Sequence, residues 1–300
     1  MDNVFANKLR KKSFSLPEAY GSQFVKRVFQ RKDMLFALAV LLLFAVLAIF
    51  APLLSPYDPN VIDLKNKNLS PSEEHILGTD YLGRDLLSRI LIGARTSLSI
   101  AAGVVLISLF LGTAAGCAAG YYGGLVDESI SRVIDIFLSF PSVIFALTIM
   151  GALGAGVFNL MLALSIVHWA KYARMMRGQV LSIKKQEFVL SAITGGAGDF
   201  YIMRKHIVPN TIATLLVLAT IDFGHVILSI ATLSFLGIGL PADVPEWGAM
   251  LSAGKEFMRT APYQTIFPGL AITFIVIIFS ILGDGMRDIL DPNHEGGEID

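Results

Sequence analysis

Long stretches without a charged residue constrain this chain more than any other feature of its sequence. Five of them hold no Lys, Arg, Asp or Glu apart from one aspartate: residues 34–54, 96–126, 136–170, 211–240 and 260–283. A helix needs about 20 mostly apolar residues to cross a bilayer. Lipid offers no hydrogen-bond partner for a bare backbone amide, so such stretches must be helical. The sequence therefore predicts an all-α integral membrane protein.

The number of crossings follows from the longest stretch. Residues 136–170 are too many for one span, and Gly151, Gly154, Gly156 and Asn159 interrupt them, so we expect a tight hairpin of two spans. The total is then six transmembrane helices, with both termini on one side of the membrane. The composition agrees, because charged residues make 16% of the chain against about 25% in soluble domains.

Basic residues set the orientation, since cytoplasmic loops carry the excess of Lys and Arg. Eight precede the first span and seven lie between spans four and five, whereas residues 55–94 hold four against six acids. Both termini should be cytoplasmic. The predicted organisation is a cytoplasmic segment 1–33, a first transmembrane helix 34–54, an extracytoplasmic loop 55–94, a five-helix domain 95–290 and a cytoplasmic tail 291–300.

The chemistry that the sequence lacks narrows the function. There is no GxxxxGK[ST] loop, HExxH, CxxC or serine elbow, and Cys117 is the one cysteine. We expect no catalytic residue and no cofactor in this chain, and the balanced charge gives no reason to expect a nucleic acid partner. Two rival classes remain. A secondary transporter would need several deep carboxylates and a second half that mirrors the first, and a membrane enzyme would need clustered ligands.

A cytoplasmic segment within residues 175–210 carries the most informative motif. It reads Gln186-Glu187-Phe188-Val189-Leu190-Ser191-Ala192, then Gly196, then Ile207-Val208-Pro209. It resembles the cytoplasmic signature of permease subunits of bacterial ABC importers, with Leu190-Ser191-Ala192 where that family has Glu-Ala-Ala. A short helix can press into a partner's cleft, Gly196 permits a sharp bend, and Pro209 is expected to end a second helix before span five. The resemblance implies a docking surface for an ATPase, made by Glu187, Leu190, Ser191, Ala192, Gly196, Ile207 and Pro209.

A second set of motifs covers most of the chain. Its members are Leu77-Gly78-Thr79-Asp80, Gly93-Ala94-Arg95-Thr96-Ser97-Leu98, Gly120-Tyr121-Tyr122-Gly123-Gly124, Leu233-Ser234-Phe235-Leu236-Gly237 and Gly283-Asp284-Gly285. They are similar to the second permease of dipeptide, oligopeptide and nickel importers. The resemblance implies a type I ABC importer permease fold in the bacterial cytoplasmic (inner) membrane. It also implies a second permease, two ATP-binding subunits that carry ATP and Mg²⁺, and an extracytoplasmic substrate-binding protein as partners.

Three residues within the spans suggest the cargo. The segments His168–Arg174 and Leu216–His225 resemble the nickel branch of this group. Asp222 and His225 stand at i and i+3 on one face of span five, and an ionisable group at that depth costs at least about 2.5 kcal/mol. Carboxylate and imidazole suit nickel, so we expect His168, Asp222 and His225 to line the substrate path and contact the metal transiently.

Alternatives to this prediction stay open. Asp222 and His225 could simply hydrogen-bond each other or a neighbouring helix, and His168 could serve a helix contact. The expected cargo is nickel or another transition metal, free or chelated, with a dipeptide or oligopeptide as the alternative.

Two further patterns concern packing. Gly112, Gly116 and Gly120 recur every four residues, which lets two helices approach closely in lipid, and we expect them at the interface between permeases. Trp247 with Tyr263 fits an aromatic belt at the outer membrane surface.

Overall fold

The computed structural model describes residues 31–241 and 243–290, and within these ranges it is built from helices and loops. The elements are α3 (Lys32–Leu54), η1 (Leu64–Asn66), α4 (Leu86–Tyr122), α5 (Gly124–Ser139), α6 (Ser142–Leu153), α7 (Val157–Ile183), α8 (Glu187–Thr194), α9 (Asp199–Ile202), η2 (Met203–Ile207), α10 (Val208–Phe235), α11 (Trp247–Gly254), η3 (Lys255–Phe257) and α12 (Tyr263–Leu290). The predicted tails 1–33 and 291–300 lie almost wholly outside the described residues.

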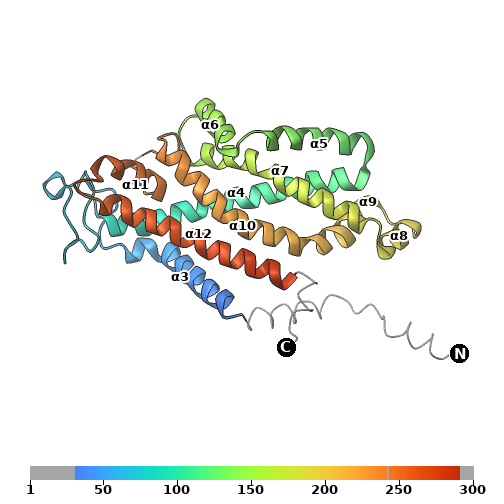
Figure 1. Ribbon diagram of the computed structural model, residues 1–300, viewed down its shortest axis with the longest axis horizontal. Coiled ribbons are helices and arrows are strands. Elements are labelled where there is room, and N and C mark those ends of the chain that lie inside the picture. Colours follow the sequence, from blue (N-terminus) through green and yellow to red (C-terminus); the bar gives the residue numbers. More distant parts are fainter. Residues whose placement is uncertain (1–30, 242, 291–300) are drawn as a thin grey trace, which may run out of the picture.

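The long helices lie side by side along the longest dimension of the molecule (Figure 1). The core packs α4 against α7 and α10 against α12, with α3 on the outside of α4 and α12. One end, which we call the loop end, carries residues 55–85 and α11. The opposite end carries α8 and α9 (Figure 1).

Several described helices can cross a bilayer by length and composition. They are α3, α4, the continuous helix Asp199–Phe235 that contains α10, and α12, and the bent pair α5 and α6 adds a fifth, broken span. The predicted helical membrane fold is therefore confirmed. The count of six also needs α7 to cross. That helix has 27 residues, but Lys171, Arg174 and Arg177 make its second half polar, so six stays a prediction.

The stretch 136–170 differs in part from the predicted hairpin. Its turn lies where the glycines placed it, with Gly154 at φ 81° and the Asn159 side chain donating to the Leu153 carbonyl at 2.8 Å. The preceding span is broken, however, because α5 and α6 meet at 94°. Proline disfavours a helical backbone in the residue before it, and Phe140, before Pro141, is extended at φ −99° and ψ 145°.

The loop 55–94 ends earlier than expected, because α4 begins at Leu86. The Asp85 carboxylate accepts a hydrogen bond from the Ser88 backbone N–H at 2.8 Å and so caps this helix. A search for charge-free stretches could not find this start, since α4 includes Arg89 and Arg95. Arg89 is buried with its guanidinium donating to the Pro59 carbonyl at 2.9 Å.

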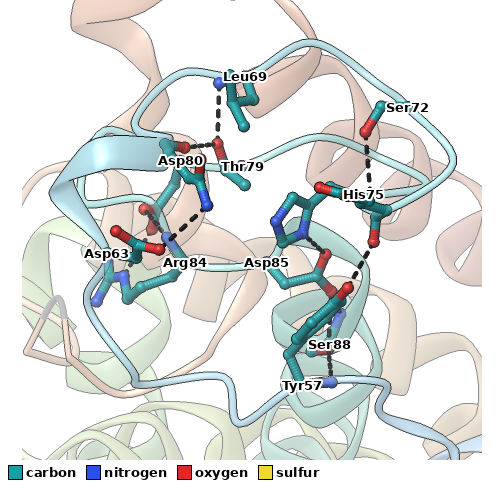
Figure 2. Close-up of polar contacts among 12 residues, drawn as sticks. Tyr57, Asp63, Leu69, Ser72, His75, Thr79, Asp80, Arg84, Asp85 and Ser88 are labelled. Atoms are coloured by element: carbon teal, nitrogen blue, oxygen red, sulfur yellow. Dashed lines mark hydrogen bonds and ion pairs between the residues drawn. The ribbon is translucent and has the colours of Figure 1, made fainter.

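The loop end is a folded cap with two buried carboxylates at its centre (Figure 2). Asp85 contacts His75 Nδ1 at 2.9 Å and accepts from the Ser88 hydroxyl at 2.7 Å. Asp80 accepts from Arg84 Nε at 2.7 Å and from the Leu82 backbone N–H at 2.8 Å. Buried charges are tolerated when they are paired and hydrogen-bonded in this way, so residues 55–85 form a fixed lid on the bundle.

Trp247 belongs to this cap and does not face lipid. Its side chain is buried, and its indole N–H donates to the Ile90 carbonyl at 3.1 Å. The preceding Glu246 caps α11 by accepting from the backbone N–H groups of Gly248 and Ala249. The aromatic belt position predicted for Trp247 is therefore wrong, because α11 folds back onto α4 and covers the ring.

The predicted glycine ladder lies within the chain, between α4 and α7. A Cβ atom on these glycines would come 2.4 Å from Tyr172 Cβ at Gly112, 2.3 Å from the Ala173 carbonyl oxygen at Gly116 and 2.7 Å from Val180 Cβ at Gly120. Real Cβ atoms do not approach other atoms so closely. The three glycines thus set the distance between two helices of one subunit, in place of the interface between permeases that we expected.

Candidate functional site

The α8 end carries a short segment whose inner face is anchored and whose outer face is apolar and exposed. Val189, Ile202 and Ile207 are fully buried and join Met176 and Val180 of α7 in one cluster. On the outside, four large side chains are exposed: Leu190, Ile193, Phe200 and Tyr201. We call this set the α8–α9 surface. Such an exposed apolar patch on a fixed support is typical of a protein contact.

The residues predicted for ATPase docking lie on this segment, with different exposures. Glu187, Leu190, Ser191, Gly196 and Pro209 are exposed, Ala192 is half-buried, and Ile207 is buried. Gly196 has φ +79°, a left-handed conformation that favours glycine and turns the chain from α8 toward α9. The motif did not include Ile193, Phe200 and Tyr201. The i+3 spacing of Ile193 from Leu190, and the apolar character of all three in a polar loop, were the available signal.

The sequence had suggested that Pro209 ends the second helix, and this prediction is wrong. The helix that starts at α9 passes through a π turn at Met203–Ile207 and continues into α10. In this turn the Val208 N–H reaches back to the Met203 carbonyl. A π turn shifts the hydrogen-bond register by one residue, and Pro209 then sits in the first turn of α10, where a missing N–H is tolerated. The α8–α9 surface is thus continuous with a transmembrane helix.

A polar link ties the same segment to α4. The Tyr121 hydroxyl at the end of α4 donates to Asp199 Oδ1, at the start of α9, at 2.8 Å. Lys184 donates to the Tyr121 carbonyl and lies 5.2 Å from the centre of its ring. These contacts join the start of α9 to the end of α4, while the continuous helix joins it to α10.

A buried polar cluster lies deep between α7 and α10. Asp222 on α10 is fully buried. Its carboxylate accepts from the Tyr172 hydroxyl at 2.9 Å, contacts His168 Nδ1 at 3.2 Å and pairs with Lys171. The three partners stand at i, i+3 and i+4 on α7 and so share one face of it. The sequence singled out His168 and Asp222 but missed Lys171 and Tyr172, although their spacing from His168 was visible.

His225 does not join this cluster. It is exposed, and among the described residues no hydrogen bond links its side chain to Asp222. Instead it lines a cavity of about 370 Å³ between α6, α7 and α10, which we call the α6–α7–α10 cavity. His168 and Lys171 line it from α7, and the hydroxyls of Ser142, Ser229 and Thr232 line it from α6 and α10.

The lining of this cavity is polar, although the cavity lies between helices of a membrane protein. His168 is buried, and its Nε2 atom has no hydrogen-bond partner among the residues that the structure describes. A second cavity of about 430 Å³ lies toward the α8 end, lined by Leu138, Lys171 and Arg174, among others. Lys171 is the residue that both cavities share, so it stands at their junction.

Metal ligation by a closed site finds no support in the described part of the chain. It holds no group of three or more His, Cys, Asp or Glu that could bind an ion. The transient metal contact predicted for His168, Asp222 and His225 therefore stays a prediction. The two imidazoles line one cavity, and the Asp222 carboxylate lies behind His168.

Two family descriptions match the sequence. Residues 108–295 match the binding-protein-dependent transport system inner membrane component, and residues 20–71 match the N-terminal TM domain of oligopeptide transport permease C. The chain belongs to the permeases of binding-protein-dependent ABC importers. Membership confirms the resemblance drawn from the cytoplasmic signature and the loop-end motifs, and it makes the chain an integral inner membrane transport subunit.

Relatives with different cargo names are about equally similar to this permease. The nickel transport system permease protein NikC of Escherichia coli (strain K12) is 42% identical over 86% of this chain and 93% of its own length. The dipeptide transport system permease protein DppC of Alkalihalophilus pseudofirmus is 41% identical over 89% of this chain and 88% of its own length. The glutathione transport system permease protein GsiD of Escherichia coli O157:H7 is 42% identical over 90% of both chains.

Solved structures support the fold. A chain of the MetNI methionine ABC transporter in an inward-facing conformation has a TM-score of 0.55 at 16% identity, over 69% of this permease and 98% of that chain. A chain of an amino acid ABC transporter has a TM-score of 0.51 at 16% identity, over 66% of this permease and 92% of that chain. The ABC importer permease fold predicted from the motifs is thus confirmed.

Proposed function

We propose that this permease forms half of the transmembrane path of an importer for nickel or another transition metal, free or chelated. The observation that carries the proposal is the α6–α7–α10 cavity with His168 at its wall. A carboxylate only accepts hydrogen bonds, so Nδ1 of His168 donates to Asp222, and Nε2, which is enclosed and has no partner among the described residues, is the ring nitrogen left for a metal. Histidines that bind metals commonly donate their other ring N–H to a carboxylate in this way.

A dipeptide or oligopeptide is the second candidate cargo. The dipeptide and glutathione permeases are as similar to this chain as the nickel permease is, and the hydroxyls and Lys171 at the cavity suit a polar organic molecule as well. An ion-coupled secondary transporter is disfavoured, because Asp222 is the one acidic residue within the five charge-free stretches and it is already paired with Lys171.

The proposed assembly contains a second permease, two ATP-binding subunits and an extracytoplasmic substrate-binding protein, with ATP and Mg²⁺ on the ATP-binding subunits. The ATP-binding subunits dock on the α8–α9 surface. Their closure moves that surface, and the motion reaches α10 through the continuous helix and α4 through Tyr121 and Asp199. The helix α10 carries Asp222, so the same motion reshapes the cavity wall.

The excess of basic residues orients this assembly. Residues 171–210 include seven Lys and Arg, which supports a cytoplasmic α8 end and cytoplasmic termini. The folded cap at the loop end then faces the substrate-binding protein. Its buried ion pairs keep it rigid, which suits a surface that must receive a soluble partner repeatedly.

Uptake in cells that express the complete transporter tests the proposal. Labelled nickel, with and without added histidine, is compared with a labelled dipeptide in the presence and absence of this chain. We expect nickel accumulation that depends on the chain and falls with His168→Ala at unchanged membrane abundance, while the control His294→Ala, near the C-terminus, behaves as the wild type. Dipeptide uptake without nickel uptake would replace the metal assignment by the peptide one.

A further inference from the structure

The carboxylate of Asp222, which lies behind the wall of the α6–α7–α10 cavity, is already bound by side chains of the protein itself. Both carboxylate oxygens of Asp222 are occupied, one by Lys171 and the other by the Tyr172 hydroxyl at 2.9 Å, and His168 contacts both. The residue is 1% exposed. No Asp or Glu lines this cavity, and Asp222 lies behind its wall. A bare divalent cation that enters therefore finds no free carboxylate among the described residues.

Lys171 presents the opposite chemistry to the cavity. A lysine ammonium has three donors, and Asp222 is the acceptor that the structure gives it. A third of its side chain is exposed, against 1% for Asp222, so the positive member of the pair faces the open space and the negative member lies behind it. An exposed ammonium beside a buried carboxylate attracts anions to the exposed side.

The remaining polar groups complete a site for one kind of molecule. Ser142 is the first residue of the 12-residue helix α6, where backbone N–H groups are free to bind an anion. The hydroxyls of Ser229 and Thr232 donate to the His225 and Leu228 carbonyls at 2.9 and 2.7 Å, so their oxygens remain free to accept a hydrogen bond from the cargo.

We propose that the α6–α7–α10 cavity binds the carboxylate group of the cargo. Lys171 pairs with that carboxylate, and the hydroxyl oxygens of Ser229 and Thr232 accept hydrogen bonds from N–H groups of the same molecule. The inference rests on the proposed function and deepens it, because it fixes the chemical form of the cargo. A metal passes here as a chelate of a carboxylate-bearing ligand, and a peptide passes with its C-terminus ionised.

The first test measures the electrostatics of the cavity without knowledge of the cargo. The assembled transporter carries Ser229→Cys with Cys117→Ala, which removes the native thiol. Reaction rates are measured with two methanethiosulfonate reagents, the anionic sulfonatoethyl form and the cationic trimethylammonioethyl form. Each rate is divided by the rate of the same reagent with a free thiol in solution, and the ratio of the anionic to the cationic value then corrects for access of the reagents to the cavity. We expect the anionic reagent to be favoured, and Lys171→Met to lower the ratio about tenfold.

Two further variants separate the effect of the Lys171 charge from the effect of leaving Asp222 unpaired and from the loss of any other cation. Lys171→Met with Asp222→Asn removes the pair without leaving a buried charge, and we expect the ratio to stay low. Lys255→Met removes a cation at the loop end and should leave the ratio unchanged. A preference of the cavity for the cationic reagent, or a ratio that Lys171→Met does not alter, would overturn the proposal.

The second test compares cargo forms in proteoliposomes with the complete transporter. The probes are dialanine against dialanine amide, and nickel with histidine against nickel with histidinamide and nickel chloride alone. We expect the carboxylate form of the transported pair to enter at least about tenfold faster, and Lys171→Met to remove that preference. Equal entry of acid and amide, or entry of nickel without a chelator at the chelate's rate, would contradict the carboxylate site.

The two tests also keep this inference apart from the proposed function. If ATP drives no uptake of any probe, the proposed cargo classes fail, and the thiol rates still decide the character of the cavity. If uptake is ATP-driven but indifferent to the carboxylate, the importer stands and the carboxylate site is lost.

Discussion

Asp222 shows how much a single residue depends on its neighbours in this protein. It lies in an apolar helix and is held by His168, Lys171 and Tyr172 from one face of α7. The sequence identified the aspartate by its depth, because an isolated charge there is costly. Its partners could not be assigned from the sequence, since they depend on the register between α7 and α10, which the packing of whole helices decides.

Removing this carboxylate should destabilise the assembled transporter. Asp222→Ala leaves the buried Tyr172 hydroxyl and His168 Nδ1 without their acceptor, and an unsatisfied buried polar group typically costs about 1–3 kcal/mol. We expect a lower melting temperature of the detergent-solubilised complex, measured by tryptophan fluorescence, and reduced membrane abundance. Asp288→Ala is the matched control, because the Arg31–Asp288 pair keeps 35% and 40% of its two side chains exposed and pairs in contact with solvent contribute about 0–1 kcal/mol. Equal stability of the two variants would show that the buried cluster contributes little.

The helices follow from the sequence more closely than their ends do. The charge-free stretches predicted α3, α4, α7, α10 and α12 at the right places, and the glycines predicted the turn before α7. The start of α4 was missed because Arg89 is buried by the cap, and the π turn before Pro209 was missed because it depends on one shifted hydrogen bond. Both are tertiary effects that no local pattern encodes.

The contact between α4 and α7 supplies a test at this scale. Gly116→Ala places a methyl group 2.3 Å from the Ala173 carbonyl oxygen, so the helices must separate, and overpacking of this kind costs about 1–3 kcal/mol. We expect a lower melting temperature and reduced uptake. Gly178→Ala in α7 has open space at its Cβ position and should leave both unchanged. An unchanged melting temperature for Gly116→Ala would contradict the close approach of the two helices.

The α8–α9 surface supplies a second test of an element. Phe200 is 73% exposed, and truncating a central aromatic side chain of an interface typically costs more than about 1 kcal/mol. We expect Phe200→Ala to lower the affinity of the ATP-binding subunits about tenfold, measured by their retention on the immobilised permease complex. Phe158→Ala, at an exposed position beside the α6–α7 turn, is the control. Full retention in Phe200→Ala would place the docking surface elsewhere.

The two ends of the molecule differ in structure. The loop end is fixed by the buried Arg84–Asp80 ion pair, by the His75–Asp85 contact and by α11, which packs on α10 and α12. The α8 end exposes apolar side chains on a segment continuous with α10 (Figure 1). Between them the cavity opens beside Asp222. Family membership could be predicted from motifs, because docking and loop-end residues have fixed spacing. The cargo could not, because it depends on a few side chains brought together from α6, α7 and α10.

ATP-driven transport in proteoliposomes tests the central claim most directly. The complete transporter is reconstituted with its substrate-binding protein outside and ATP inside, and uptake of nickel with histidine and of dialanine is measured against a preparation that lacks this chain. The account predicts accumulation of one of them that requires ATP, the substrate-binding protein and this permease together. Accumulation driven by an ion gradient without ATP, or equal uptake in the absence of this chain, would contradict it.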